Sequence, residues 1–434
     1  MIRFLKKQPP VRLIAGGFLL VILIGSLLLM LPISLKDGAE LKYIDSLYTA
    51  VSAVCVTGLS TVEVGAILSI FGRIVFALLI QIGGLGVATI GAWLIMIMGK
   101  KMDLKSRNLV HEAMNLASGN GVARFLKEVF FTTLVIEAIG AILSFIALLK
   151  YFEWQSALGY ALFHAVSAFN NAGFDIFGQG TNLIPYQNDV LFNLTTCALI
   201  IFGGIGFLVI REIREKKIRF SKYSMHTKVV LLMTIILLLG GTLLIKFTEW
   251  SNITWLGAFF SSVTARTAGF STFSFGAFSK AGLLVMIALM FIGASPGSTG
   301  GGIKTTTFFV IVKSITSAVK ERDVRIFKYS IPQKIYKKAS VIAFIGISVI
   351  MVSTLLMCIF EPDINFIDIL FESVSAFATV GLSTGITSEL SLGSKIVSII
   401  VMYIGRLGPL TVASLWNFSK ASVVRYPDGN LAIG

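Results

Sequence analysis

Four short glycine-containing segments are the part of this 434-residue sequence best suited to chemistry. Each of them has one glycine in a shared setting, within SAVCVTGLST, SAFNNAGFDI, SVTARTAGFST and SAFATVGLSTG, and the four glycines are Gly58, Gly173, Gly269 and Gly381. Glycine adopts positive φ without steric cost, so the chain can expose carbonyl oxygens where other residues would be strained. Rings of such carbonyls replace the hydration shell of a cation that enters a membrane. The chemistry we predict is therefore coordination of a dehydrated cation by main-chain oxygens.

The predicted ligands are the last residues of each segment up to and including its glycine. We expect the constriction to be lined by Val56, Thr57, Gly58, Asn171, Ala172, Gly173, Thr267, Ala268, Gly269, Thr379, Val380 and Gly381. None of these is a carboxylate, so a ring of acidic side chains is not the selectivity device. Divalent ions, which favour dense carboxylate coordination, are therefore disfavoured.

The elements that position these segments lie in a membrane. Apolar residues make up 55% of the chain and charged residues 14%, with a mean hydropathy of +0.86. A polar surface cannot cover such a composition, which predicts a polytopic membrane protein. Several uncharged runs approach the roughly 20 residues that a helical span needs. These runs are residues 13–31, 74–99, 190–210, 229–245, 281–303 and 340–360. The first is too long for a signal peptide, and no small-residue cleavage motif follows it.

The four segments belong to an internal repeat. Each copy has an apolar span, a short aromatic and aliphatic stretch, the glycine segment and a second apolar span. The short stretch, about 10 to 12 residues, fits a half-helix that enters from outside and stops midway. Two full spans per copy give successive copies the same orientation around one axis. The alternative is that the stretches are surface helices whose glycines are ordinary C-caps.

These patterns predict the fold class. We expect an all-α integral membrane protein with four parallel repeats, each a span, a pore helix and a span, and with fourfold pseudosymmetry around one ion pathway. The predicted repeat boundaries are residues 1–99, 100–211, 212–318 and 319–434.

A glycine-rich loop, GASPGSTGGGIKTTT from residue 293, interrupts the second span of the third copy. It is not a phosphate-binding loop, because Ile303 separates Gly302 from Lys304 and no strand precedes it. Non-helical backbone at this depth is tolerated where it lines a water-filled cavity. We therefore predict a movable gate below the glycine segments; a tightly packed helix crossing is the alternative. The predicted gate residues are Gly293, Ala294, Ser295, Pro296, Gly297, Ser298, Thr299, Gly300, Gly301, Gly302, Lys304 and Arg406.

Four charged residues lie where contact with hydrocarbon would be costly. Arg266 either binds the glycine loops or forms a structural tie to an acid such as Glu372. Lys304 either holds the gate or extends toward the membrane surface. Arg406 replaces a small residue of the other copies, which favours a position facing the pore or the loop. Glu137 is expected to pair with a neighbouring helix that the sequence does not identify.

The charge distribution predicts the orientation. The 37 basic residues outnumber the 22 acidic ones, and most lie at the N-terminus, in alternate connectors and in the C-terminal tail. This positive-inside pattern places both termini in the cytoplasm. No soluble domain is left to carry a nucleic-acid-binding face, so we expect no nucleic-acid partner. The basic segments 100–107, 211–222 and 320–338 are either docking sites for a cytosolic subunit or topology signals only.

The repeat, together with SPGSTGGGIKT in the third copy and IGRLGPLT in the fourth, resembles the Trk/Ktr/HKT superfamily of potassium transporters over essentially the whole chain. The resemblance implies potassium uptake, often sodium-dependent, across a bacterial cytoplasmic membrane. It also implies a homodimer surrounded by lipid, with a pore in each protomer, and a cytosolic ring of nucleotide-binding RCK subunits. Each copy has one glycine in place of the longer TVGYG filter of tetrameric channels, so selectivity is expected to vary within the superfamily.

Three other functions remain alternatives. A less selective channel for potassium and sodium fits the same residues. A cation symporter with alternating access would show inverted repeats and matching broken helices; here the repeats are parallel, and only the third copy is predicted to have a broken span. An enzyme is not expected, because His111, His164 and His226 have no carboxylate or cysteine cluster around them. Cys55, Cys197 and Cys358 form no disulfide or zinc pattern, and no cofactor is predicted beyond K⁺, and in some cases Na⁺, as the transported ion.

Overall fold

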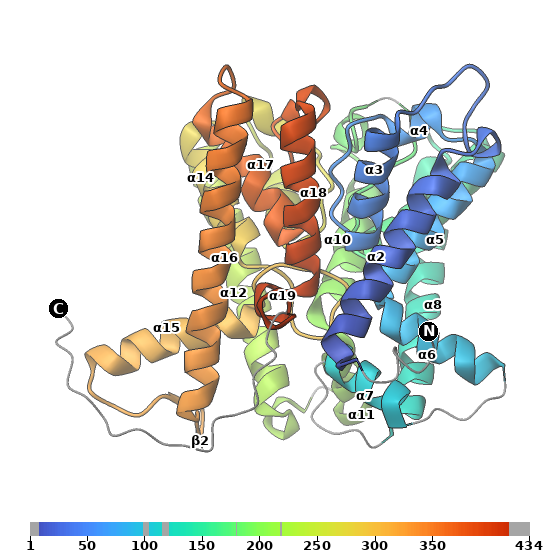
Figure 1. The fold of residues 1–434 in the computed structure, drawn as a ribbon. Coiled ribbons are helices and arrows are strands. Elements are labelled where there is room, and N and C mark those ends of the chain that lie inside the picture. Colours follow the sequence, from blue (N-terminus) through green and yellow to red (C-terminus); the bar gives the residue numbers. More distant parts are fainter. Residues whose placement is uncertain (1–7, 99–103, 115–120, 179, 218, 416–434) are drawn as a thin grey trace.

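The computed structural model describes residues 8–98, 104–114, 121–178, 180–217 and 219–415. Long helices run side by side through the molecule (Figure 1). Within the described residues, four helices are long and apolar enough to cross a membrane, and two bent helix pairs raise this number to six. The four long helices are α2 (Pro10–Leu29), α8 (Val122–Leu148), α12 (Met225–Thr248) and α16 (Gln333–Phe360). Each is the first long helix within one of the four predicted residue ranges, and their number fits a polytopic membrane protein.

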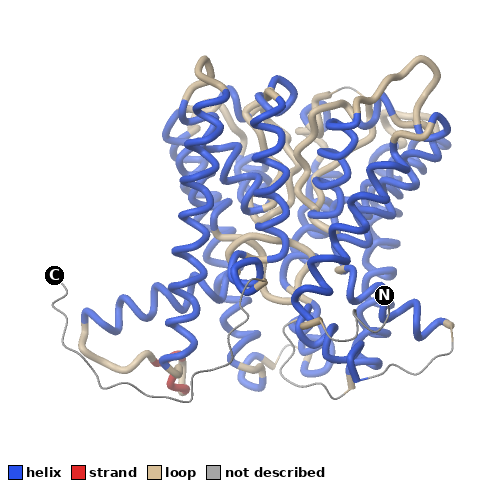
Figure 2. The backbone as a smooth tube through the Cα atoms, in the orientation of Figure 1, coloured by secondary structure: helices blue, strands red, loops and turns tan. Residues whose placement is uncertain are grey.

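A short helix follows each long one and packs against it. The short helices are α3 (Tyr43–Cys55), α9 (Trp154–Phe169), α13 (Trp255–Thr264) and α17 (Phe366–Ala378). Their lengths run from 10 residues in α13 to 16 in α9, so α9 is longer than expected. Each ends inside the protein, and loop backbone continues through the middle of the helical bundle (Figure 2).

The second span of every repeat is interrupted, so the prediction of a single broken span in the third repeat is wrong. Helices α5 (Ile70–Leu85) and α6 (Val87–Ile97) meet at 102°, and α10 (Val190–Ile205) and α11 (Phe207–Lys216) meet at 97°. In the third repeat, α14 (Lys280–Phe291) and α15 (Thr305–Val319) flank the glycine-rich loop. In the fourth, α18 (Leu392–Leu407) is followed by α19 (Pro409–Ser414).

Glycines with positive φ cause three of these breaks. Gly86, Gly206 and Gly408 have φ values of 87°, 94° and 89°, which ends one helix and starts the next in a new direction. This conformation strains other residue types but not glycine. Apolar composition continues through each break, which is why a hydropathy pattern alone did not predict it.

The remaining elements are short. A two-stranded antiparallel ribbon and several connecting helices complete the described chain. These are α4 (Val64–Ile67), α7 (Leu104–Ala113), β1 (Arg325–Ile326), β2 (Tyr329–Ser330) and the 3-10 helices η1 (Pro32–Ser34), η2 (Ile184–Tyr186), η3 (Phe220–Lys222), η4 (Phe275–Ala277) and η5 (Ile386–Glu389).

Polar contacts fix the positions of two helices at the edges of the bundle. Asp189 caps α10, because its Oδ1 accepts from the amide of Phe192 at 3.0 Å. Its Oδ2 accepts from Lys150 Nζ at 2.8 Å. Burial of Asp189 alone would raise its pKa, but these hydrogen bonds outweigh burial and lower the pKa below its ordinary value. The cap therefore holds the start of α10 against the end of α8.

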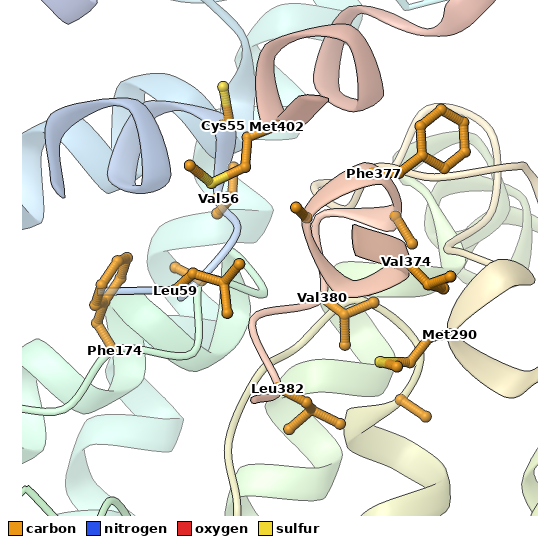
Figure 3. Packing of buried hydrophobic residues seen from close by; sticks show 14 of the residues in the cluster. Cys55, Val56, Leu59, Phe174, Met290, Val374, Phe377, Val380, Leu382 and Met402 are labelled. Carbon is orange, nitrogen blue, oxygen red and sulfur yellow. The ribbon is translucent and has the colours of Figure 1, made fainter. Parts of the chain in front are cut away.

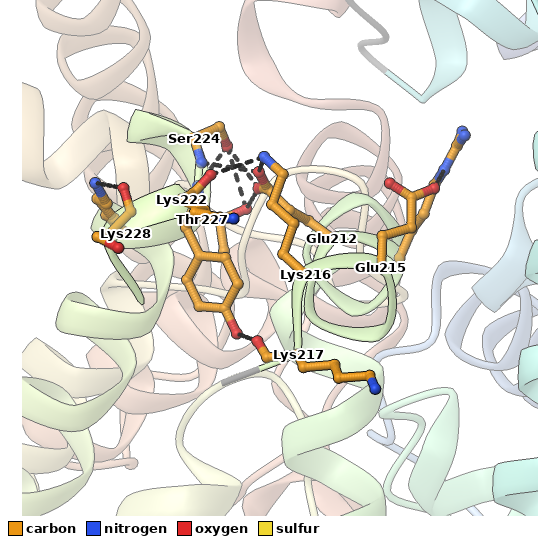
Figure 4. A network of polar contacts seen from close by, with 11 residues as sticks. Glu212, Glu215, Lys216, Lys217, Lys222, Ser224, Thr227 and Lys228 are labelled. Atoms are coloured by element: carbon orange, nitrogen blue, oxygen red, sulfur yellow. Dashed lines mark hydrogen bonds and ion pairs between the residues drawn. The ribbon is translucent and has the colours of Figure 1, made fainter. Parts of the chain in front are cut away.

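Helix α11 is attached to the start of α12 by Glu212. The Glu212 carboxylate accepts from the amide of Ser224 at 2.8 Å, from the Ser224 hydroxyl at 2.7 Å and from the Thr227 hydroxyl (Figure 4). Lys216, one turn along α11, donates to the same carboxylate at 2.5 Å. The negative group lies at a helix N-terminus, where the macrodipole favours it. One acidic side chain thus joins α11 to the first turn of α12.

Candidate ion pathway

The four glycine segments share one backbone conformation. Gly58, Gly173, Gly269 and Gly381 all have positive φ, between 71° and 98°. The residue two positions before each glycine is also left-handed, with φ between 51° and 67°, and these residues are Val56, Asn171, Thr267 and Thr379. A left-handed conformation costs a non-glycine residue roughly 1–2 kcal/mol. Such strain persists where the surrounding structure imposes it, and it concentrates at functional sites.

The sequence predicted positive φ only at the glycines. The left-handed β-branched residues were missed, because their intrinsic preference is for extended backbone. Their shared position, two residues before the glycine and just after a short helix in all four copies, is the signal that could have predicted a positive φ.

The four glycines form a closed ring. A methyl group added to Gly58 would lie 2.7 Å from the Ala172 oxygen and 3.2 Å from the Gly381 Cα. One added to Gly173 would meet the Gly269 Cα at 2.7 Å, and one added to Gly269 would meet the Val380 oxygen at 2.5 Å. Segments far apart in the sequence therefore converge in the order of the repeats. No side chain fits between neighbours, so main-chain atoms form the ring.

Hydroxyl groups of the short helices hold the glycine segments. Ser52 Oγ accepts from the amide of Gly58, and Ser375 Oγ accepts from the amide of Gly381, both at 3.1 Å. In the second repeat, Ser167 Oγ accepts from Phe174 N at 3.0 Å. These serines were not predicted. Each precedes the glycine of its own segment (Gly58, Gly173 or Gly381) by the same number of residues, so a comparison of the copies would have marked them. These bonds engage amides of the segments, whereas the Gly173 carbonyl accepts from Asn182 Nδ2 at 3.3 Å.

Apolar side chains of the segments pack away from the ring. Val56, Leu59, Val380 and Leu382 belong to one buried hydrophobic cluster, together with Met290 (Figure 3). This burial is the tertiary force that holds the strained backbone in place.

A cavity lies on each side of the ring. One, of about 370 Å³, is lined by Gly58, Gly173, Gly381 and residues that follow them, including Glu63 and Asp175. The other, of about 540 Å³, is lined in part by the glycine-rich loop, by Arg406 and by residues at the breaks of the second spans. Ring and cavities together outline a candidate path through the bundle.

The glycine-rich loop lies directly against the ring. A methyl group added to Gly300 would be 2.0 Å from Thr267 Oγ1, and one added to Gly301 would be 2.2 Å from Thr379 Oγ1. The loop is also bonded to the second repeat, since the amides of Ser295 and Thr299 donate to glycine carbonyls at the end of α10 at 3.0 and 3.2 Å. The structure therefore brings the predicted gate residues next to two of the four segments.

Arg406 and Lys304 both contact this loop through its carbonyls. Arg406 donates to the Thr299 oxygen and to the oxygens of Gly83 and Gly84 in the first repeat. Lys304 Nζ donates to the Gly300 oxygen at 2.7 Å, so it bends back onto the loop. The link from Arg406 to the first repeat was not predicted.

Arg266 does not form the suggested ion pair with Glu372. No ion pair joins the two among the described residues, and the Arg266 Nε and Nη2 atoms are buried without a hydrogen-bond partner. Glu372 instead accepts from Thr387 Oγ1 at 2.5 Å. The structural tie suggested for Arg266 is therefore not formed with Glu372 among the described residues.

A family model described as TrkH, a cation transport protein, matches residues 13–422. The chain belongs to this family. The Ktr system potassium uptake protein B of Bacillus subtilis is 40% identical, over 100% of this chain and 98% of that protein. The potassium/sodium uptake protein NtpJ of Enterococcus hirae is 37% identical, over 100% of this chain and 99% of its own length.

The fold of this cation transport protein also matches a solved structure. The potassium transporter TrkH from Vibrio parahaemolyticus superimposes with a TM-score of 0.70 at 18% identity, covering 93% of this chain and 85% of that one. The predicted relationship to the Trk/Ktr superfamily is therefore confirmed. The family is described as one of cation transport proteins. In the described part of the chain, His, Cys, Asp and Glu form no cluster suited to a metal ion.

Proposed function

We propose that this cation transport protein takes up potassium through a pore whose filter is the ring of four glycine segments. The observation that carries the proposal is the closed ring itself, in which main-chain atoms from four repeats converge between two cavities. The C-terminal ends of the short helices point to this ring, and their negative dipole ends favour a cation. The printed names of two relatives, a potassium uptake protein at 40% identity and a potassium/sodium uptake protein at 37%, support potassium as a transported ion.

The glycine-rich loop, residues 293–302, is the proposed gate. It lies against Thr267 and Thr379 at one end of the ring, where an ion leaving the filter would meet it. Arg406 is the proposed latch, because one guanidinium joins the loop to the first repeat. Arginine suits this role since its donors form a rigid fork and its charge repels a passing cation.

The proposed assembly is a homodimer in the bacterial cytoplasmic membrane, with both termini cytoplasmic. A cytosolic RCK-type subunit would dock on the basic segments 211–222 and 320–338, of which only residue 218 lies outside the described residues. The further predicted segment, 100–107, lies partly outside the described residues. The printed name of the Bacillus relative, part of a Ktr system, supports a multi-component transporter.

A less selective pathway for potassium and sodium is the second candidate. The printed name of the Enterococcus relative, a potassium/sodium uptake protein, favours it. The breaks in all four second spans also remove one reason for setting aside alternating access.

Flux into liposomes that contain the purified protein tests these proposals. We expect rubidium and potassium to enter faster than sodium, and potassium flux to continue without a sodium gradient. Equal rates for all three ions would support the less selective channel. Flux that stops without a gradient of a second ion would support a symporter and contradict the channel-like pore.

A further inference from the structure

Glu137 is a buried acid that the proposed pathway does not use. It lies on α8 with 8% of its surface exposed. Its Oε1 accepts from Asn170 Nδ2 at 3.2 Å, and the same Nδ2 donates to Gln81 Oε1 at 2.7 Å. Three polar side chains from α8, α5 and the end of α9 thus meet inside the bundle. Glu137 is the only one of the three that can carry a charge.

No cation compensates this carboxyl group. None of the ion pairs formed by described residues involves Glu137. Arg406, which also contacts α5, donates to main-chain oxygens of α5 and of the loop and not to Glu137. An ionised carboxylate that is buried without a partner is strongly disfavoured, above all inside a membrane.

The cluster also lacks one hydrogen-bond donor. Asn170 Oδ1 is fully buried and has no hydrogen-bond partner. The two hydrogens of Asn170 Nδ2 already face Gln81, Glu137 and the Val166 carbonyl. A proton on Glu137 supplies one additional O–H donor within this group. The lack of an ion pair for Glu137 and the lack of a donor for Asn170 Oδ1 therefore both favour a protonated, neutral Glu137.

The position of Asn170 connects this cluster to the ion pathway. Asn170 directly precedes the second glycine segment, 171–173. Its Oδ1 also lies against α5, where a methyl group added to Gly84 would be 2.1 Å away. The Gly84 carbonyl accepts from Arg406 at 3.0 Å. An interaction that fixes the Asn170 side chain therefore also fixes the second glycine segment and the part of α5 that accepts a hydrogen bond from Arg406.

We propose that Glu137 is a protonated positioning residue, which binds Asn170 and Gln81 as a neutral acid and thereby fixes the second glycine segment. It acts through Asn170 and does not touch the ion. The inference rests on the proposed filter, but its protonation state can be measured without any ion flux.

Infrared spectroscopy of the purified protein in liposomes tests the protonation state. We expect a carbonyl stretch from protonated carboxyl groups near neutral pH, one component of which disappears in Glu137→Gln while the contribution of the buried Glu372 remains. Glu153→Gln is the matched control, since Glu153 is exposed at the start of α9, and it should leave the band unchanged. If the band is absent from the unaltered protein, or if Glu137→Gln removes no component of it, the proposal fails whether or not the protein selects potassium.

Flux in the same liposomes tests the positioning role. Glu137→Gln keeps a neutral donor and acceptor, so it should retain the ratio of rubidium to sodium flux. Glu137→Leu removes the hydrogen bond to Asn170, and we expect the ratio to fall about fivefold, as the loss of one hydrogen bond implies.

An unchanged ratio in folded Glu137→Leu overturns the positioning role, and a collapsed ratio in Glu137→Gln shows that a charge is required. If Glu137→Leu does not fold, Gln81→Leu takes its place, because it removes the second side-chain acceptor of Asn170 Nδ2 and should lower the ratio in the same way. No rubidium preference in the unaltered protein would contradict the proposed filter, while the infrared result would still decide the protonation state.

Discussion

Replacement of Gly381 by serine is the sharpest test of the carbonyl ring. Gly381 has φ 91°, and a Cβ at this position would lie 2.0 Å from the Thr57 oxygen and 2.8 Å from the Gly58 Cα. An ordinary contact between carbon and carbonyl oxygen is about 3.3 Å, so the two segments must move apart by about 1 Å. The Thr57 oxygen, a predicted ion ligand, cannot keep its position.

Gly385 provides a matched control. It has φ 110°, and a Cβ added there meets nothing within 4 Å. Serine at Gly385 therefore costs the same kind of backbone strain, roughly 1–2 kcal/mol, without displacing the ring. Comparison of the two variants separates strain from displacement of the ligands.

We expect Gly381→Ser to lower the ratio of potassium to sodium flux at least about tenfold, which needs a change of only about 1.4 kcal/mol in relative ion binding. Gly385→Ser should keep the ratio of the unaltered protein. The assay is paired flux in liposomes, with thermal unfolding as a check that both variants fold. A folded Gly381→Ser protein with normal selectivity, or an equal loss in both variants, would refute the carbonyl-filter reasoning.

Three further predictions concern the gate, the partner and stability. Arg406→Ala, or a shortened 293–302 loop, should raise potassium flux severalfold in liposomes, because either change releases the loop. The flux should also depend less on a regulatory subunit. Unchanged flux in the protein with the shortened loop would mean that the loop glycines serve packing and not gating. Charge reversal across 100–107, 211–222 and 320–338 should weaken co-purification of a cytosolic RCK-type subunit, whereas intact assembly after reversal at all three segments would leave those charges as topology signals. Asp189→Ala should cost about 1 kcal/mol of stability through the lost helix cap, measured by thermal unfolding. The pKa of Asp189 is lowered in the fold, so the ionised carboxylate contributes its full stabilisation above the ordinary value of 3.8. This stabilisation is lost as the pH falls below that value. The difference in stability between Asp189→Ala and the unaltered protein should therefore shrink only in that acid range.

The sequence alone determined the local elements and their repetition. Long apolar runs, short stretches before each glycine and the glycine-rich loop are properties of neighbouring residues, so they were visible without coordinates. The positions of Arg406 and Glu137 within apolar stretches were likewise enough to mark them for attention. The elements and the two charged residues could be recognised because a membrane penalises exposed polar groups whatever their tertiary partners.

The tertiary structure decided which of these residues meet. Arg406 reaches Gly84 as well as the loop, whereas Arg266 does not reach Glu372, and no spacing in the sequence distinguishes the two cases. The break at Gly86 depends on a positive φ that apolar composition conceals. Closure of the ring joins residues hundreds of positions apart, and their contact is fixed by packing between repeats. Local preference favours an extended conformation at Val56 and Thr379, and only that packing holds them left-handed, because burial of their side chains outweighs the strain.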